Sequence, residues 1–237
     1  MSIFIPECKI SVYLISLIAG IIGGVAIAAV LQKKSKIKYI YIISGVMINT
    51  VLVIYFGVIG DLVTGFREGV ISLNFTSVGG AVGMITGTVV MFFVTKNHDV
   101  LKAGATAIPF MYSVSKIGCL FSGCCGGREY YGPGAVTYTG RLNAVYSVPT
   151  FPVQLLETVC FMIVFIVMLT LYNRVGYLWH VLVNLYLCAT LKFVIDFLRV
   201  SHEGVIISLN QICCIVLVVI VTAIMMVSRK FSGSKSN

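Results

Sequence analysis

The stretch from residue 115 to residue 127 ends an apolar segment with a cation, three thiols and four glycines. Lys116 lies within that segment, where a charge is costly unless it has a partner. Cys119, Cys124 and Cys125 supply reactive thiols, and glycine allows the backbone to approach a ligand or another backbone closely. Together these residue types predict a binding or catalytic site.

A second candidate group opens another apolar segment. Pro152 suits a helix start, and Gln154 and Glu157 are three residues apart, so they share one helical face. A carboxylate one turn into an apolar helix indicates a functional group. The alternative is a shallow carboxylate that reaches the membrane interface.

A third group closes a further apolar segment, where Lys192, Asp196 and Arg199 follow one another at i, i+4 and i+7. This spacing predicts cation, anion and cation along one helical edge. A structural ion pair explains Lys192 and Asp196 equally well. The second cation is better explained by an anionic phosphate.

Glycines recur every four residues at Gly79, Gly83 and Gly87, which places them on one helical face. Packing against another helix is one interpretation. The other is that Gly79 and Gly80 bring a lipid head group close to backbone N–H groups at a helix start.

The elements that must position these residues are membrane spans. Of 237 residues, 59% are hydrophobic and 11% charged, and the mean hydropathy is +1.03. A soluble domain has about 25% charged residues. Segments long enough to cross a bilayer cover residues 10–31, 37–60, 77–95, 103–122, 153–172, 177–198 and 206–228, the third and fourth being the weakest. We therefore expect an all-α membrane protein, a seven-helix transmembrane bundle forming one domain over residues 1–237.

The net charge of +9 comes from basic residues that lie mostly on one predicted side of the membrane, so it does not indicate a nucleic-acid partner. Ten basic residues follow the odd-numbered spans: Lys33, Lys34, Lys36, Lys38, Lys96, Lys102, Arg174, Arg229, Lys230 and Lys235. The positive-inside rule then predicts an outside N-terminus and a cytoplasmic C-terminus. The turn from Lys96 to Lys102 is expected to be solvated.

Residues 128–152 form the longest polar loop, which includes Arg141 and Asn143. With the predicted orientation it lies outside the membrane. We expect a small cap there, with short strands around residues 136–138.

These segments resemble the bacterial prolipoprotein diacylglyceryl transferase family over nearly the whole chain. The matching residues, in the family's order, are Gly79, Gly80 and Gly83, then Lys116 and Gly118, then Pro152, Gln154, Leu155 and Glu157, and finally Lys192, Phe193, Asp196 and Arg199. The Gly-Cys-x-x-x-Gly-Cys-Cys pattern from Gly118 to Cys125 is similar to a divergent branch of that family.

The resemblance implies transfer of the diacylglyceryl group of phosphatidylglycerol to the lipobox cysteine thiol of a preprotein, with release of glycerol phosphate. It implies a bacterial cell membrane. We also expect no cofactor, no metal and no nucleic-acid partner. The expected substrate-binding residues are Lys116, Gly118, Gly79, Gly80, Gln154, Lys192 and Arg199. The expected catalytic residues are Glu157, Asp196, Cys119, Cys124 and Cys125, the carboxylates acting as base or orienting the cations.

The chain departs from the family pattern at several of these positions. Val78 stands where the family usually has His. Lys116 and Lys192 replace arginines, so bidentate hydrogen bonding to phosphate is replaced by the point charge of an ammonium group. Cys119 and Cys124 replace Asn and Glu. A non-catalytic lipid-binding relative, or a transferase with another acceptor, is therefore an alternative.

The three cysteines at residues 119, 124 and 125 allow a different interpretation, a thiol or metal centre. Zinc usually has four ligands, and no His is nearby in sequence, which disfavours a metal. A disulfide between Cys119 and one of the other two is a further alternative. A secondary transporter is disfavoured because the halves show no inverted repeat.

Overall fold

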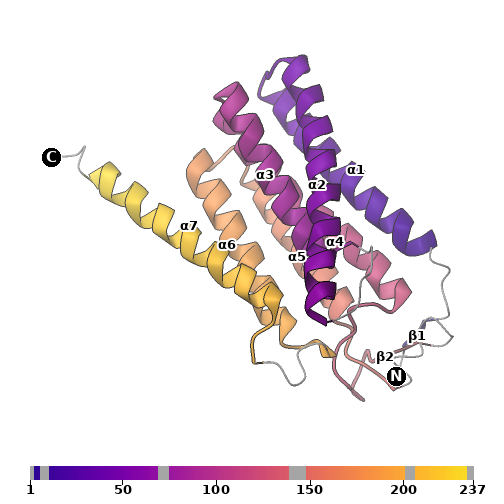
Figure 1. Cartoon of the computed structure of the whole chain (residues 1–237). Helices are drawn as coiled ribbons and strands as arrows, with labels where there is room; N and C mark the ends of the chain where they lie inside the picture. Colours follow the sequence, from indigo (N-terminus) through magenta and orange to yellow (C-terminus); the bar gives the residue numbers. More distant parts are fainter. Residues whose placement is uncertain (1–2, 6–10, 69–74, 139–147, 201–205, 234–237) are drawn as a thin grey trace.

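The computed structural model describes residues 3–5, 11–68, 75–138, 148–200 and 206–233 (Figure 1). The helices within these ranges are α1 (Ser11–Lys34), α2 (Tyr39–Glu68), α3 (Ser77–Thr95), α4 (His98–Ser122), α5 (Val153–Thr170), α6 (Tyr177–Asp196) and α7 (Leu209–Gly233). Two short strands, β1 (Ile3–Ile5) and β2 (Val136–Tyr138), complete the described elements. The predicted all-α class is confirmed.

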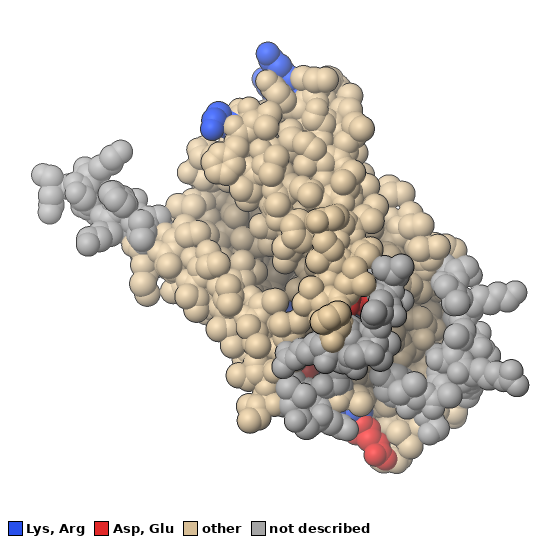
Figure 2. Space-filling model, in the orientation of Figure 1, with Lys and Arg blue, Asp and Glu red and all other residues tan. Residues whose placement is uncertain are grey.

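Five of the described helices, α1, α2, α3, α5 and α6, are long and apolar enough to cross a membrane. Their outward faces carry large apolar side chains such as Ile15, Ile22 and Met47, each more than half exposed. Figure 2 shows Lys and Arg at one end of the molecule and acidic and basic side chains together at the other, with a broad and almost uncharged surface between them. Helices satisfy their own backbone polar groups, so such a surface is stable against lipid. The protein is a multi-pass membrane protein.

The central helix, α4, is not among those five apolar helices. It packs against α1, α3, α5 and α6, and most of its side chains are buried. Because protein rather than lipid surrounds it, α4 tolerates polar residues, which is the physical reason for the weak span expected at residues 103–122. The other span expected to be weak, α3, is nevertheless long and apolar enough to cross a membrane.

The glycine stripe of α3 lies against α2. A Cβ atom on Gly79 would come within 2.2 Å of the carbonyl oxygen of Phe56, and one on Gly83 within 2.3 Å of that of Leu52. Any larger residue would force the two helices apart. The packing interpretation of this stripe is confirmed.

A small cap covers one end of the bundle, next to the N-terminus in Figure 1. The strands β1 and β2 pair in parallel, with Ile3 opposite Val136 and Ile5 opposite Tyr138. Ile5, Val136 and Tyr138 form an apolar cluster with Leu120 of α4. The strand expected at residues 136–138 is confirmed, whereas β1 was not predicted; Arg141 and Asn143 lie outside the described residues.

The turns that join α1 to α2, α3 to α4 and α5 to α6 lie at the opposite end (Figure 1). The expectation of a solvated turn from Lys96 to Lys102 is wrong at Lys102. The helix α4 begins at His98, and Lys102 is buried, with its Nζ donating to the carbonyl oxygen of Val175 at 2.8 Å. The α5–α6 turn supplies this acceptor in place of water.

Candidate functional site

The carboxylate of Glu157, just after the first turn of α5, is completely buried at the centre of a charged cluster. It accepts hydrogen bonds from Arg199 Nη2 at 2.8 and 2.7 Å, from Lys192 Nζ at 2.9 Å and from the Tyr112 hydroxyl at 3.0 Å. Lys116 Nζ lies 3.5 Å from Glu157 Oε2. The alternative of a shallow carboxylate at the membrane interface is therefore wrong.

Helix α4 presents two members of the cluster on one face. Tyr112 and Lys116 are one turn apart, and Lys116 Nζ lies 5.1 Å from the centre of the Tyr112 ring. Helices α5 and α6 pack against α4 and bring Glu157 and Lys192 to the same place. Three helices therefore deliver charged residues to one place.

Asp196, the last residue of α6, forms the second anionic centre. Its Oδ1 lies 3.1 Å from Lys192 Nζ and 3.4 Å from Arg199 Nε, so the predicted i, i+4 ion pair is confirmed. The Ser208 hydroxyl donates to Asp196 Oδ2. Asp196 thus joins the cluster to the start of α7.

Arg199 lies beyond the end of α6, so the expectation that it continues the helical edge of Lys192 and Asp196 is wrong. An antiparallel bridge to Gly127 sets its place. Two backbone hydrogen bonds flank the bridge: the Arg128 N–H donates to Leu198 O at 3.0 Å, and the Val200 N–H donates to Gly126 O at 3.2 Å. A Cβ on Gly127 would lie 2.2 Å from a carbonyl oxygen, so only glycine fits there. Backbone pairing, not helical periodicity, directs the guanidinium to Glu157.

Ser208 also caps the N-terminus of α7, which begins at Leu209. Its hydroxyl accepts from the Gln211 N–H at 3.1 Å, and the Gln211 side chain accepts from the Ser208 N–H at 3.0 Å. This reciprocal pair is a capping box. The Gln211 amide also donates to Phe193 O on α6, so the cap fixes α7 next to the charged cluster.

The cluster carries an excess of positive charge. Lys116, Lys192 and Arg199 contribute three positive charges, and the two carboxylates contribute two negative ones, which leaves one positive charge. All five side chains are buried. Arg199 Nε makes no hydrogen bond within the described residues. An anionic group at this place would balance the charge and reduce the cost of burying it.

An apolar cavity of about 400 Å³ reaches the cluster. Its walls come from α3, α4, α5, α6 and α7, and include Val78, Ile85, Phe161 and Leu217. Lys192 and Tyr112 also line it, so one part of an otherwise apolar cavity carries a cation. The arrangement fits a molecule with apolar chains and an anionic group.

The comparison with protein families agrees with this geometry. The family described as prolipoprotein diacylglyceryl transferase matches residues 1–227, which include every residue of the cluster. The chain belongs to the prolipoprotein diacylglyceryl transferase family. No curated protein matches the chain significantly.

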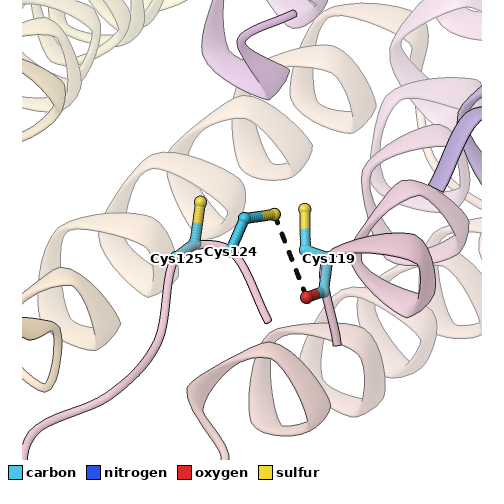
Figure 3. Close-up of side chains that lie close together, drawn as sticks. All are labelled: Cys119, Cys124 and Cys125. Carbon is cyan, nitrogen blue, oxygen red and sulfur yellow. Dashed lines mark hydrogen bonds between the residues drawn. The ribbon is translucent and has the colours of Figure 1, made fainter. Parts of the chain in front are cut away.

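In this member of the transferase family, the turn after α4 brings three thiols together (Figure 3). The Sγ atoms of Cys119, Cys124 and Cys125 all lie within 4.8 Å of one another, and all three are free thiols. Gly123 and Cys125 adopt left-handed backbone conformations, with φ of 72° and 58°. These conformations turn the chain back, so that both later cysteines lie near Cys119.

The thiols lie close to the cations of the cluster. Hydrogen bonds from Cys119 and Cys124, together with the charges of Lys116 and Arg199, hold the pKa of the exposed Cys125 thiol well below its usual range. Cys125 is therefore the thiol best able to exist as a thiolate.

Gln154 links the same turn to the cap. Its amide nitrogen donates to the carbonyl oxygen of Cys124 at 2.8 Å and to the Tyr138 hydroxyl at 3.3 Å. Gln154 is almost fully buried. The geometry gives it a structural contact, and its direct role with substrate stays a prediction.

The predicted substrate-binding glycines pack against other helices. A Cβ on Gly118 would lie 2.8 Å from Ser16 Cβ, so Gly118 allows α1 and α4 to approach closely. The Gly79 N–H donates to Thr76 Oγ1 and the Gly80 N–H to Thr76 O, which caps α3. Both amides thus have partners within the protein, and head-group binding by them stays a prediction.

Sequence reasoning missed Tyr112 and Ser208. Tyr112 precedes Lys116 by four residues, so helical periodicity was the signal that placed it on the same face. Ser208 and Gln211 have the S-x-x-Q spacing of a capping box just before an apolar run. The sequence contained both the helical spacing and the capping pattern. Neither pattern predicts that the two hydroxyls donate to the carboxylates of Glu157 and Asp196.

Proposed function

We propose that this protein transfers the diacylglyceryl group of phosphatidylglycerol to the thiol of a lipobox cysteine in secreted preproteins. Membership of the prolipoprotein diacylglyceryl transferase family supports this proposal. The observation that carries it is the buried cluster with one excess positive charge at the edge of an apolar cavity of about 400 Å³. Phosphatidylglycerol has the matching chemistry, two apolar chains and one phosphate charge.

The cations have a direct role in the proposed reaction. The acceptor sulfur attacks the glycerol carbon that carries the phosphate ester, a C–S bond forms, and the C–O bond breaks. Glycerol phosphate leaves with the oxygen and its electron pair, while the thiol proton passes to solvent. Lys116, Lys192 and Arg199 stabilise the charge that develops on the departing phosphate.

Glu157 acts in this proposal by orienting the cations. Three cations and the Tyr112 hydroxyl surround its carboxylate and favour its ionised form. A carboxylate held in this way is a weak proton acceptor. Asp196 has the same orienting role for Lys192 and Arg199. Deprotonation of the incoming thiol is assigned to Cys119 in the last turn of α4 and to Cys124 and Cys125 in the turn that follows.

The test is transfer by the purified protein in detergent, supplied with phosphatidylglycerol and a peptide with a lipobox cysteine. We expect mass spectrometry to detect the diacylglyceryl peptide and glycerol phosphate. Lys192→Met should abolish both products, whereas Lys33→Met, an exposed lysine at the other end of the bundle, should leave them unchanged.

One result would favour the non-catalytic relative, for which Val78 in the cavity wall is the supporting observation. That result is selective binding of phosphatidylglycerol over a zwitterionic lipid without any product. Equal binding of anionic and zwitterionic lipids would overturn both proposals.

We also propose that residues 1–237 form one domain, of the Gly-Cys-x-x-x-Gly-Cys-Cys branch, in a bacterial cell membrane. The cap faces outward and the exposed lysines at residues 33, 34, 36 and 38 face the cytoplasm. A membrane-impermeant thiol reagent applied to intact cells should label Tyr131→Cys more than the parent protein and should not add label to Ser35→Cys. The reverse labelling would invert the topology.

A further inference from the structure

The turn that follows α4 brings three sulfur atoms to one point at a cost in backbone strain. Cys125 is a non-glycine residue in the left-handed region, with φ of 58°. A side chain in that region raises the energy of the backbone, and such residues are concentrated at functional sites. In Figure 3 the three thiols lie together on one side of the backbone. The strain is explained if the convergence of the thiols serves a ligand.

The separation of the sulfur atoms fits a metal ion. With Zn–S bonds of about 2.3 Å, two thiolates on a tetrahedral zinc ion lie about 3.8 Å apart. The three Sγ atoms lie within 4.8 Å of one another, so shifts of about 1 Å or less suffice. Sequence reasoning disfavoured a metal because a fourth ligand was missing. Catalytic zinc sites commonly have three protein ligands and an open fourth position.

We propose that Cys119, Cys124 and Cys125 bind one zinc ion, whose open fourth position takes the acceptor thiol. The identity of the acceptor rests on the proposed function. A zinc ion with three thiolates carries one negative charge, and Lys116 and Arg199 lie close enough to interact with Cys125 electrostatically. These two cations would reduce the cost of the negative charge on the zinc site.

The proposal gives the acceptor thiol a way to become a thiolate. A thiol that coordinates zinc loses its proton, which passes to solvent. The sulfur then forms the C–S bond to the glycerol carbon as the C–O bond breaks, and glycerol phosphate leaves with the electron pair. Zinc keeps its oxidation state throughout, so no oxidant or reductant is needed.

Metal binding is tested with the full chain in detergent, reduced with a phosphine and loaded with Zn²⁺ or Co²⁺ alone. We expect one ion per chain by elemental analysis, and thiolate-to-cobalt charge-transfer absorption with the visible bands of tetrahedral Co²⁺. Cys119→Ser, Cys124→Ser and Cys125→Ser should each weaken binding by about 10-fold to 100-fold or more, the loss typical even of an outer-shell partner. Cys160→Ser and Cys213→Ser, which lie on α5 and α7, are the matched controls and should bind normally.

Folding and lipid binding of each variant are measured without metal, by thermal unfolding and by phosphatidylglycerol affinity. A variant that keeps both and loses the ion supports the site. Unchanged metal binding in the triple Ser variant would overturn it. Failure of the reduced wild type to take up one ion would also overturn the site. This holds whether or not the unreduced protein forms a disulfide between two of the three cysteines.

The acceptor position is tested on the Co²⁺ protein with a lipobox peptide and its Cys→Ser version. The Cys peptide should shift the visible bands and the Ser peptide should not; no shift would overturn the role of the fourth position. A shifted spectrum without transfer would refute the proposed function and leave the metal site standing. Full transfer by metal-free protein would refute the zinc inference and leave the function standing.

Discussion

Helix α4 carries two buried polar groups, one near each end, and they differ in how their charge is balanced. Near the cap, Lys116 meets the carboxylate of Glu157 in a cluster that keeps one excess positive charge. Near the other end, Lys102 donates to a backbone carbonyl, and Thr106 forms a hydrogen bond with His180 at 2.8 Å. We call the second group, Lys102, Thr106 and His180, the distal group; all three of its side chains are buried.

The comparison teaches that burial of polar side chains does not by itself mark a site in a membrane protein. The distal group ties α4 to the α5–α6 turn and to α6 through hydrogen bonds, and none of its three residues lines the described cavity of about 400 Å³. The Glu157 cluster supplies Tyr112 and Lys192 to that cavity. Lys102 also keeps its positive charge, so what distinguishes the site is a cation, Lys192, at a place that a ligand can reach.

The largest effect should follow replacement of Glu157 by Gln. This change leaves three buried cations without their shared carboxylate, and breaking a buried ion pair costs about 3–5 kcal/mol of the free energy of unfolding. Lipid transfer should also be lost. Unfolding in detergent measures the first effect, with the exposed Glu129→Gln as control. A loss below about 1 kcal/mol, the range of a surface pair, would contradict the central role of Glu157.

A pair of lysine variants separates the two groups directly. Lys192→Met should weaken phosphatidylglycerol binding by about 1.5–3 kcal/mol, the range for a hydrogen bond to a charged group, or about 10-fold to 150-fold. Lys102→Met should leave this affinity unchanged and affect stability alone. Lipid affinity measured in nanodiscs of mixed composition provides the comparison. Equal losses in the two variants would show that the distal group also belongs to the lipid site.

Ser208→Ala should lower the free energy of unfolding by about 1 kcal/mol, as expected for loss of a helix N-cap. The same change removes the hydrogen bond to Asp196, so phosphatidylglycerol affinity should fall slightly. Ser208→Thr keeps the hydroxyl and should restore both quantities. Ser44→Ala, which removes an exposed hydroxyl on α2, is the control. If Thr fails to rescue, the cap is not the cause.

The smallest effect on lipid transfer is expected in the distal group. Thr106→Val keeps the shape of the side chain and removes its hydrogen bond to the buried His180, at a cost of about 1–3 kcal/mol in stability. Phosphatidylglycerol affinity and transfer should not change. A measurable loss of transfer in the folded variant would show that the two ends of α4 are coupled.

The sequence predicted the helices and the charged residues of the site for the same reason. Long apolar segments stand out against a polar background, and single charges such as Glu157 stand out within them. Contacts between distant segments were not predictable in this way. Lys102 was expected in solvent because its acceptor, Val175, is 73 residues away, and β1 was missed because its partner strand is more than 130 residues away.

The pairing of Gly127 with Arg199 fixes the spacing between the cysteine turn and the Arg199 guanidinium. Cys124 and Cys125 lie just before Gly127, and Arg199, which we propose to bind the phosphate, lies opposite Gly127. A slip of one residue in this register would move the two groups by about 3.3 Å and reverse the direction of the side chains. Side chains on the segments around Gly127 and Arg199 can therefore change, for other acceptors or head groups, without a change in the backbone pairing. In the proposed reaction this pairing keeps the distance between the acceptor sulfur and the lipid carbon.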